Sequence, residues 1–320
     1  MKAAIEVQNL QKIYENGLEA LKGINLSIPQ GSFYGLLGPN GAGKTTTIGI
    51  ITGLVNITSG SATIMGHDSV NNFRMARKLI GLSPQELNFD VFFSLEELLE
   101  LQAGYYGLSF QKAKERTNLM LQQFGLIKKR KSRSRELSGG MKRRVQIAKA
   151  LIHDPPIVIL DEPTAGVDIE LRHMLWDYLR QINKEGKTIL LTTHYIEEAE
   201  QLCETVSIID DGKIITSDSP EKLIRTHGMS GLEIILSSSL DNMDMGNWGY
   251  KKIDGKINVD TSQPEKDMAK IICQISNQGG VIENVHIYRS SLEDVFMKLT
   301  GKSLQNEVAC VGSKGDIMNV

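Results

Sequence analysis

Residues 38–45 read Gly38-Pro39-Asn40-Gly41-Ala42-Gly43-Lys44-Thr45, which has the spacing G-x-x-x-x-G-K-[ST] of a phosphate-binding loop. The apolar run at 33–37 predicts a buried strand before the loop, and the residues from Lys44 onward predict a helix. Glycine lets the backbone turn so that several N–H groups converge on a phosphate, and the helix N-terminus adds partial positive charge. A Gly-rich turn without a ligand is the alternative, but the strand–loop–helix context favours a nucleoside triphosphate site.

An acidic pair stands where such a loop needs one. The apolar run at 156–160 predicts a strand that ends in Asp161 and Glu162. Asp161 can hold Mg²⁺ opposite the Thr45 hydroxyl, while Lys44 reaches the β- and γ-phosphates. Glu162 can polarise the water that attacks the γ-phosphate. An acidic pair after a strand is by itself most often a turn; beside a phosphate loop it predicts nucleotide hydrolysis.

A second Gly-rich stretch, Leu137-Ser138-Gly139-Gly140-Met141, opens a predicted helix about twenty residues before the acidic pair. Exposed N–H groups and a hydroxyl at a helix start form an anion site. With the loop and the acidic pair, this stretch resembles the signature motif of ATP-binding subunits of ATP-binding-cassette (ABC) transporters. The family's most frequent form ends in Gln, where this chain has Met141, but Ser138 and Gly140 supply the phosphate contacts. The resemblance implies that the motif closes over ATP held by a second subunit, so a head-to-tail homodimer on ATP binding is expected.

Four further residues match the family in the same order along the chain. The resemblance implies that Tyr14 stacks on adenine and that Gln85 touches Mg²⁺ or the attacking water. It implies that Asp168 contacts the opposite subunit and that His194 hydrogen-bonds the γ-phosphate. Taken alone, these residues would be read as a core tyrosine, a turn, a helix N-cap and a structural histidine.

The resemblance therefore implies a complete ATP site with Mg²⁺. The expected catalytic residues are Glu162, His194, Lys44 and Gln85, and the expected metal ligands are Thr45, Gln85 and Asp161. The expected nucleotide-binding residues are Tyr14, Gly38, Pro39, Asn40, Gly41, Ala42, Gly43, Lys44, Thr45, Thr46, Ser138, Gly139, Gly140 and Asp168.

The alternation of predicted helices and strands indicates an α/β fold with a P-loop NTPase core. Antiparallel strands are expected within 3–28, followed by a mixed sheet covered on both faces, with an all-helical insertion at about 88–140. Three parts are predicted: an ATP-binding domain at 1–220, a small α+β accessory domain at 221–300 and a flexible tail at 301–320. The charge run at 128–135 is interpreted as a solvated loop.

Composition narrows the function classes. The chain has 320 residues and a formal net charge of −2, which gives no global electrostatic argument for nucleic acid as a partner. Its apolar runs are shorter than a membrane helix, and the first residues lack the apolar stretch of a signal peptide. Cys203, Cys273 and Cys310 form no C-x-x-C pair, so a reduced, cytoplasmic compartment is expected, with Cys203 and Cys273 in the core.

The C-terminal part adds a weaker resemblance. Residues 291–296 and 299–301 look like the closing segment of subunits paired with ABC-2-type permeases, which commonly export drugs or lipophilic compounds. The expected function is ATP hydrolysis that powers export, of the multidrug-exporter kind, through a separate ABC-2-type permease at the inner face of the membrane. Three alternatives stay open: a soluble ABC ATPase acting on ribosomes or nucleic acid, a phosphotransferase, and a non-catalytic binding module.

Overall fold

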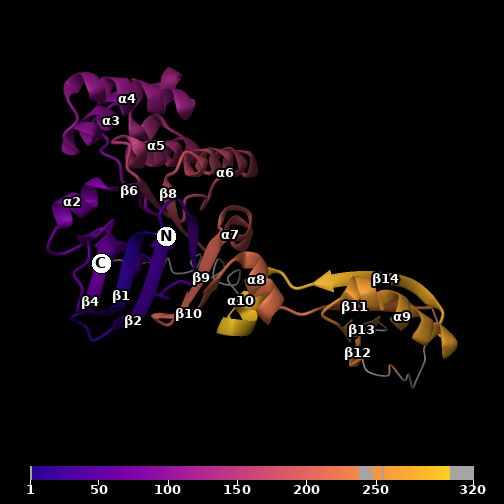
Figure 1. Cartoon of the computed structure of the whole chain (residues 1–320). Coiled ribbons are helices and arrows are strands. Elements are labelled where there is room, and N and C mark those ends of the chain that lie inside the picture. The colour runs from indigo at the N-terminus through magenta and orange to yellow at the C-terminus, as the bar shows by residue number, and fades with distance from the viewer. Residues whose placement is uncertain (1, 238–244, 246–247, 254–255, 303–320) are drawn as a thin grey trace, which may run out of the picture. The chain divides into compact units, whose positions relative to one another are not determined.

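The computed structural model describes residues 2–237, 245, 248–253 and 256–302, which form two compact units (Figure 1). The first unit comprises Met1–Ser219 and the second Pro220–Ser303. From residue 303 onward, the tail expected at 301–320 lies outside the described residues.

A six-stranded sheet forms the centre of the first unit, with strand order β10-β9-β3-β8-β7-β6. Neighbouring strands from β9 to β6 run parallel, while β10 pairs antiparallel with β9 across the turn at Asp211 and Gly212. Every residue of β3, β7 and β8 is buried, as expected for parallel strands covered on both faces. The strands are β3 (Phe33–Leu37), β6 (Ile80–Ser83), β7 (Ile157–Asp161), β8 (Thr188–Thr193), β9 (Thr205–Asp210) and β10 (Lys213–Asp218).

Helices pack against this sheet. α5 lies against β6 and β7, and α7 lies against β3 and β8. α6 buries five side chains at helical spacing, including Leu175, Leu179 and Ile182. The helices are α1 (Lys44–Ile51), α5 (Gly139–Leu151), α6 (Ile169–Lys184) and α7 (Ile196–Leu202).

An antiparallel sheet with order β2-β1-β4-β5 makes up the N-terminal part of the first unit. The strand region expected at 3–28 is two long strands, and a third, β4, pairs with β1. Apolar side chains of this sheet share one core with α1 and the central sheet, including Ile5, Leu21 and Ile64. The phosphate-binding loop is thereby fixed between two sheets. The strands are β1 (Ala3–Ile13), β2 (Glu19–Pro29), β4 (Ser59–Ile64) and β5 (His67–Asp68).

The expected helical insertion contains α3 (Leu95–Tyr105) and α4 (Phe110–Gln123), which pack on each other and on α5 (Figure 1). Ser94 and Glu97 form a capping box at the start of α3. The charge run that follows contains the short 3-10 turns Ile127–Lys129 and Ser134–Glu136. Arg130 and Lys131 of this run both pair with Glu96 of α3 at 2.7 Å. Two of its charges therefore have an acidic partner within the insertion. A short helix, α2 (Phe73–Lys78), precedes β6.

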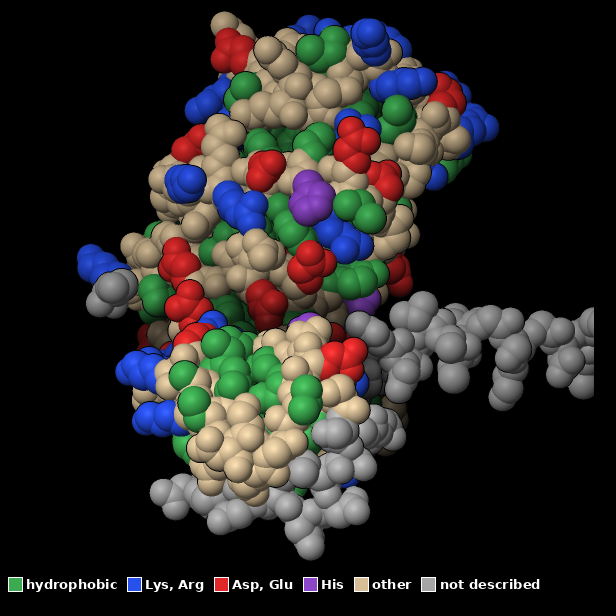
Figure 2. All heavy atoms as spheres, turned by 90° about the vertical axis from the view of Figure 1, so that its right-hand side faces the viewer, with side chains coloured by type: hydrophobic (Ala, Val, Ile, Leu, Met, Phe, Trp, Pro, Cys, Tyr) green, Lys and Arg blue, Asp and Glu red, His purple; other side chains and the backbone are tan. Residues whose placement is uncertain are grey.

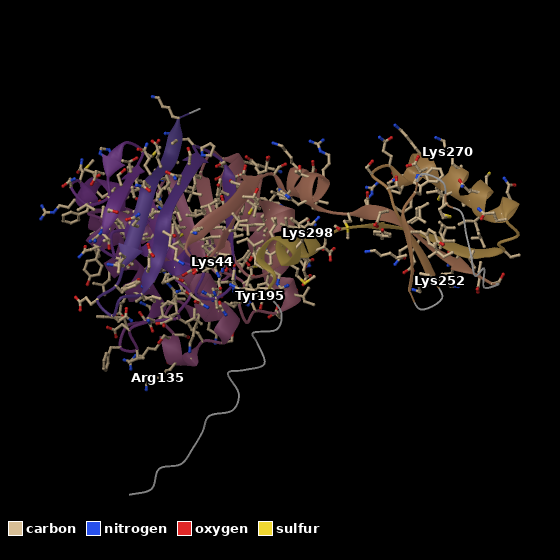
Figure 3. The ribbon with its side chains drawn as sticks, turned by 90° about the horizontal axis from the view of Figure 1, so that it is seen from below. Lys44, Arg135, Tyr195, Lys252, Lys270 and Lys298 are labelled. Carbon is tan, nitrogen blue, oxygen red and sulfur yellow. The ribbon has the colours of Figure 1, made fainter. Side chains whose placement is uncertain are left out.

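The second unit contains one antiparallel sheet, β12-β13-β11-β14, with α9 packed against it. Figure 3 shows Lys270 of α9 and Lys252 of β12 on opposite sides of this unit. α8 and α10 pack on each other. The elements are α8 (Pro220–His227), β11 (Ser230–Leu236), β12 (Tyr250–Ile253), β13 (Lys256–Asp260), α9 (Pro264–Asn277), β14 (Ile282–Arg289) and α10 (Leu292–Thr300).

Two details of the second unit differ from the sequence prediction. Cys273 is exposed, so its expected place in the core is wrong; Cys203 is buried. The buried residues of α9 include Ile271 and Ile275, and Cys273 lies midway between them, on the opposite face of the helix. α8 was not predicted, although Pro220 occupies the first helical position, where proline favours a helix start.

Candidate functional site

The phosphate-binding loop joins β3 to α1, and its glycines are required by its shape. Gly41 has φ 78° and Gly43, the N-cap of α1, has φ 112°, a region that L side chains avoid. A Cβ atom on Gly38 would lie 2.3 Å from the carbonyl oxygen of Ile209. The Lys44 Nζ atom donates to the carbonyl oxygens of Gly38 at 2.6 Å and Pro39 at 3.1 Å. The lysine charge is thus held over the loop's own backbone.

The register of β7 and β8 brings the first carboxylate of the acidic pair into position. Asp161 pairs with Thr192, and the Thr192 hydroxyl donates to the Asp161 carboxylate. The Thr45 hydroxyl also hydrogen-bonds this carboxylate. Burial raises the pKa of Asp161 and the adjacent Glu162 charge raises it further, against the opposing effects of these hydroxyls and of Lys44. The predicted metal ligands Thr45 and Asp161 are in contact.

The second carboxylate, Glu162, is 5% exposed and sits at φ 50°, in the left-handed region. Its Oε2 accepts a hydrogen bond from Gln85 Nε2 at 2.8 Å, and its Oε1 lies 3.2 Å from His194 Nδ1. Burial raises the pKa of Glu162, but the hydrogen bond and charge of His194, with the charges of Lys44 and Arg143, bring it below its usual value. Glu162 is therefore a carboxylate at neutral pH, as a general base must be.

Most of the loop, with Gln85 and Glu162, lines a pocket of about 240 Å³; Asp161 and His194 lie behind Thr45 and Glu162 and are not part of its wall. Glu162 and Gln85 lie on its wall together with Lys44, which is labelled in Figure 3 and is 5% exposed. The Tyr14 hydroxyl is 3.2 Å from Thr46 Oγ1, and Lys12 Nζ stands 4.9 Å from the centre of the Tyr14 ring. The aromatic residue expected to stack on adenine thus borders the phosphate loop. The predicted residues of the pocket wall are Tyr14, Pro39, Asn40, Gly41, Gly43, Lys44, Thr45, Thr46, Gln85 and Glu162.

The other predicted nucleotide-binding residues do not line this pocket. Ser138 is the exposed N-cap of α5, and its hydroxyl accepts from Met141 N–H at 3.3 Å. Asp168 is the exposed N-cap of α6, and its carboxylate accepts from Leu171 N–H at 2.8 Å. A Cβ atom on Gly140 would lie 2.6 Å from Leu171 Cδ2, so the two helix starts approach closely. Both N-cap residues are therefore exposed to solvent and lie outside the pocket that the phosphate loop lines.

The residues present fit a magnesium ion bound with a nucleotide. Thr45 hydroxyl and Asp161 carboxylate offer oxygen atoms, the ligands that Mg²⁺ prefers, and Asp161 carries a negative charge that burial disfavours. Within the described part of the chain, no group of three or more His, Cys, Asp and Glu side chains could hold a metal ion. Mg²⁺ at a nucleotide site needs only one or two protein ligands because phosphates and water supply the rest.

Sequence reasoning did not identify several polar residues that support this site. Arg143 and Gln146, on α5, bind the backbone around Gln85. Glu198, on α7, is fully buried and accepts from Thr164 at 3.1 Å and from Trp176 Nε1 at 3.2 Å. Burial raises the pKa of Glu198 despite these hydrogen bonds. Their spacing of three residues places Arg143 and Gln146 on one face of the helix, but it does not show that this face is buried.

The surface adds little evidence for other kinds of partner. On the face of the first unit seen in Figure 2, acidic and basic side chains alternate across the middle. A second pocket, of about 530 Å³, lies in the second unit; one of its charged residues, Arg289, is bonded to Glu265. Among the described residues, no helix has the length and apolar character required to cross a membrane.

Comparisons with known proteins find relatives along most of the chain. The family model described as "ABC transporter" matches residues 21–165. The chain is 34% identical over 312 residues to the Nod factor export ATP-binding protein I of Burkholderia orbicola (strain AU 1054), covering 95% of this chain and 99% of that protein. The protein of the same name from Rhizobium sp. (strain N33) is 35% identical over 308 residues, covering 95% and 99%. These similarities extend through the second unit.

Solved structures match about two thirds of the chain. An ATP-binding subunit of an ABC transporter has 31% sequence identity and a TM-score of 0.65, covering 69% of this chain and 92% of that chain. A dimeric ATP-binding cassette in a post-hydrolysis state, bound to ADP and Pi, has 28% identity and a TM-score of 0.63, covering 67% and 98%. The predicted α/β P-loop fold with its N-terminal antiparallel sheet is confirmed.

Proposed function

Because this chain belongs to the ATP-binding subunits of ABC transporters, and so is an ATPase, we propose that it powers export through a separate ABC-2-type membrane permease. Relatives that match it along nearly its whole length are named as export ATP-binding proteins. The match includes the second unit, whose closing segment resembles that of ABC-2-type partners. This supports export rather than a soluble role on ribosomes or nucleic acid.

The residues that we propose hydrolyse ATP lie at the carboxyl ends of the strands of the central sheet. The loop N–H groups and Lys44 bind the phosphates, and Tyr14 stacks on the adenine ring. Glu162 takes a proton from the attacking water, held in orientation by Gln85 at 2.8 Å and His194 at 3.2 Å. Lys44 and His194 offset the charge that develops on the γ-phosphate. Thr45, Asp161 and Gln85 would hold Mg²⁺, which supplies further charge neutralisation for the phosphates.

One observation carries the proposal of a paired mechanism. The loop, Gln85 and Glu162 line one pocket, while Ser138 and Asp168 are exposed helix N-caps outside that pocket. A helix start with exposed N–H groups is a site for an anion that comes from elsewhere. In the proposal this anion is the ATP of a second copy, so two chains bind two ATP molecules head to tail. Hydrolysis lets the pair reopen, and this two-state motion drives the permease.

The first experiment is the mass of purified Glu162→Gln protein by light scattering, with and without ATP. This variant keeps the shape of the side chain and loses the base, so ATP stays bound and the closed state accumulates. The expected result is a monomer that becomes a dimer when ATP is added. Ser138→Arg in the same background places a bulky cation at the start of α5 and should abolish the dimer while ATP affinity at the phosphate loop is unchanged.

Further measurements separate a failure of the pairing mechanism from a failure of the export role. A chain that binds ATP, measured by calorimetry, yet stays monomeric at saturating ATP contradicts pairing by the isolated subunit. The measurement is then repeated as cross-linking in membranes that contain the permease. If ATP also fails to promote pairing there, the head-to-tail mechanism is wrong. A permease that leaves the ATPase rate unchanged and does not retain the chain on membranes would contradict the export role.

A further inference from the structure

Two side chains of α5 hold the backbone around Gln85. Arg143 Nη1 donates to the carbonyl oxygens of Pro84 and Gln85, both at 3.2 Å, and to Gln146 Oε1 at 3.1 Å. Gln146 Nε2 donates to the carbonyl oxygens of Pro84 at 2.7 Å and Glu86 at 2.6 Å. Three consecutive carbonyl groups are thus bound by two neighbouring side chains of one helix.

These donors are buried although the segment that they bind is exposed. Arg143 is 3% exposed and Gln146 is 5% exposed, whereas Pro84, Gln85 and Glu86 are exposed residues in an irregular segment. Burial lowers the pKa of Arg143, and the charges of Glu162, Asp161 and Glu198 oppose this effect. A buried guanidinium and a buried amide are costly unless they are paired, so the pairing must be kept for these residues to stay inside.

The bound segment leads directly to the hydrolytic carboxylate. Gln85 Nε2 donates to Glu162 Oε2 at 2.8 Å. A hydrogen bond of this length is lost when either partner moves by about 1 Å, because its strength falls steeply with distance and angle. The backbone position of 84–86 therefore sets the orientation of Glu162, and Arg143 and Gln146 set that backbone position.

The same helix begins at Ser138. Arg143 lies five residues further along α5, or roughly 7.5 Å at 1.5 Å per residue, within one continuous helix. A helix of this length moves as a rigid body because its backbone hydrogen bonds are internal. A displacement of the Ser138 end is therefore carried to Arg143 and Gln146.

We propose that Arg143 and Gln146 are positioning residues that couple the start of α5 to the hydrolytic carboxylate through the backbone of 84–86. The coupling rests on the proposed function, in which the start of α5 engages the ATP of a second copy. Engagement at Ser138 then sets Gln85, and through it Glu162, in the same subunit. Each chain senses its partner's ATP at the residue that hydrolyses its own.

The test is steady-state ATP hydrolysis by the full chain with Arg143→Met or Gln146→Met. Both changes keep a long side chain and remove the donors. The turnover number kcat should fall by roughly 10-fold to 100-fold, as expected when a catalytic group is displaced by about 1 Å. KM for ATP should stay within about 2-fold, because residues 38–46 are untouched. Arg143→Lys, which keeps a buried donor, should recover part of kcat.

The matched control is Arg144→Met on the same helix. Arg144 Nη1 donates to the carbonyl oxygen of Phe124 at 2.9 Å, so this change also removes a guanidinium bonded to backbone but leaves 84–86 alone. It should lower the melting temperature as Arg143→Met does, with kcat unchanged.

A double-mutant cycle separates positioning from general stability. If Arg143 acts through Gln85, Arg143→Met should lower kcat by less than about 2-fold in a Gln85→Ala background. An equal fold-loss of kcat in both backgrounds, or equal behaviour of Arg143→Met and Arg144→Met, overturns the proposal. If Arg143→Met does not fold, the same cycle is run with Gln146→Met. Failure of the unaltered chain to pair or hydrolyse ATP would count against the proposed function, not against this coupling alone.

Discussion

The parallel strands of the central sheet have polar side chains at both of their ends, called here the carboxyl edge and the amino edge of the sheet. The side chains of the two ends form different kinds of hydrogen bond. At the carboxyl ends of β7 and β8, side chains bond to one another, and Glu162 receives both Gln85 and His194. At the amino ends, side chains bond to backbone carbonyls, and Asp154 adds ion pairs with Lys187 and Arg116. Arg116, for example, donates to the carbonyl oxygens of Leu151 and Ile152.

The amino edge repeats this pattern. Asn183 Nδ2 donates to the carbonyl oxygens of Gly31 at 2.8 Å and Lys187 at 2.9 Å. Lys187 Nζ donates to Asp154 at 2.7 Å and to the carbonyl oxygen of Pro155 at 2.9 Å. These bonds pair backbone carbonyl groups in the turns that precede the strands.

The contrast teaches how to tell functional from structural polarity. At the amino ends, side chains that bond to backbone carbonyls stabilise the fold; at the carboxyl ends, Lys44 makes the same kind of bond within the phosphate-binding loop itself. A cluster in which carboxylates, a hydroxyl, an amide and an imidazole meet around a pocket carries buried charge that a ligand can complete. Changes at the carboxyl edge should therefore alter activity, and changes at the amino edge should alter stability.

Gly38→Ala should show the largest effect at the carboxyl edge. The new Cβ atom would lie 2.3 Å from the carbonyl oxygen of Ile209, so the loop backbone must move. The kcat/KM for ATP should fall by about 100-fold or more, the loss expected when a substrate-positioning group is displaced by about 1 Å, and ATP affinity measured by calorimetry should fall with it. Gly186→Ala at the amino edge is the control, because Gly186 has φ 99° but open space around it. It should lower stability by roughly 1–2 kcal/mol with ATP affinity intact; a loss of affinity there would break the contrast.

Arg116→Met should show the next effect, now on stability. The change removes two hydrogen bonds to backbone carbonyls, at 3.0 Å to Ile152 and 2.7 Å to Leu151, and leaves the Leu151 carbonyl with only its bond from Asp154 N–H. The free energy of unfolding should fall by about 1–3 kcal/mol, measured by urea denaturation. The kcat for ATP should be unchanged at a temperature where the variant is folded. A large fall in kcat would show that the amino edge also reaches the catalytic residues.

His153, also at the amino edge, should give the smallest effect, through pH. Burial lowers its pKa to about 4; the charges of Arg116 and Lys187 act in the same direction, against the Ile80 carbonyl and Asp154. The unfolded chain has the usual value near 6.5, so below about pH 6.5 it binds more protons than the folded chain. Stability should therefore fall as pH drops from about 6.5 to 4. Across this pH window, the melting temperature of His153→Gln should fall by a few degrees less than that of the unaltered chain. An unchanged dependence of melting temperature on pH would contradict the lowered pKa of His153.

The sequence was most informative where chemistry demands adjacent residues. The loop at 38–45 and the pair Asp161 and Glu162 are contiguous, so their order alone predicts a strand–loop–helix and a strand tip. The fold class followed from the alternation of helices and strands around them. Gln85 and His194 needed the family resemblance, since each is a single residue, and the structure places both against Glu162.

The sequence was silent where a residue acts through tertiary contact. Thr192 looks like any β-branched residue of a strand, and only the register with β7 brings its hydroxyl to Asp161. Arg143 and Gln146 have the spacing of a solvent-facing pair on a helix, yet both are buried. Cys273 was misplaced because a single apolar residue does not reveal which face of α9 is covered.

The position of α5 has a genetic consequence. On the proposed pairing, this one helix serves two ATP sites: the partner's through Ser138 and its own through Arg143 and Gln146. A change that displaces α5 as a whole but leaves the chain able to pair then harms both sites of any pair that the chain joins. In a cell making damaged and intact chains together, most pairs contain a damaged chain. Alleles that displace this helix without preventing pairing should therefore be dominant, whereas alleles that merely destabilise the chain, as Arg144→Met is expected to, should be recessive.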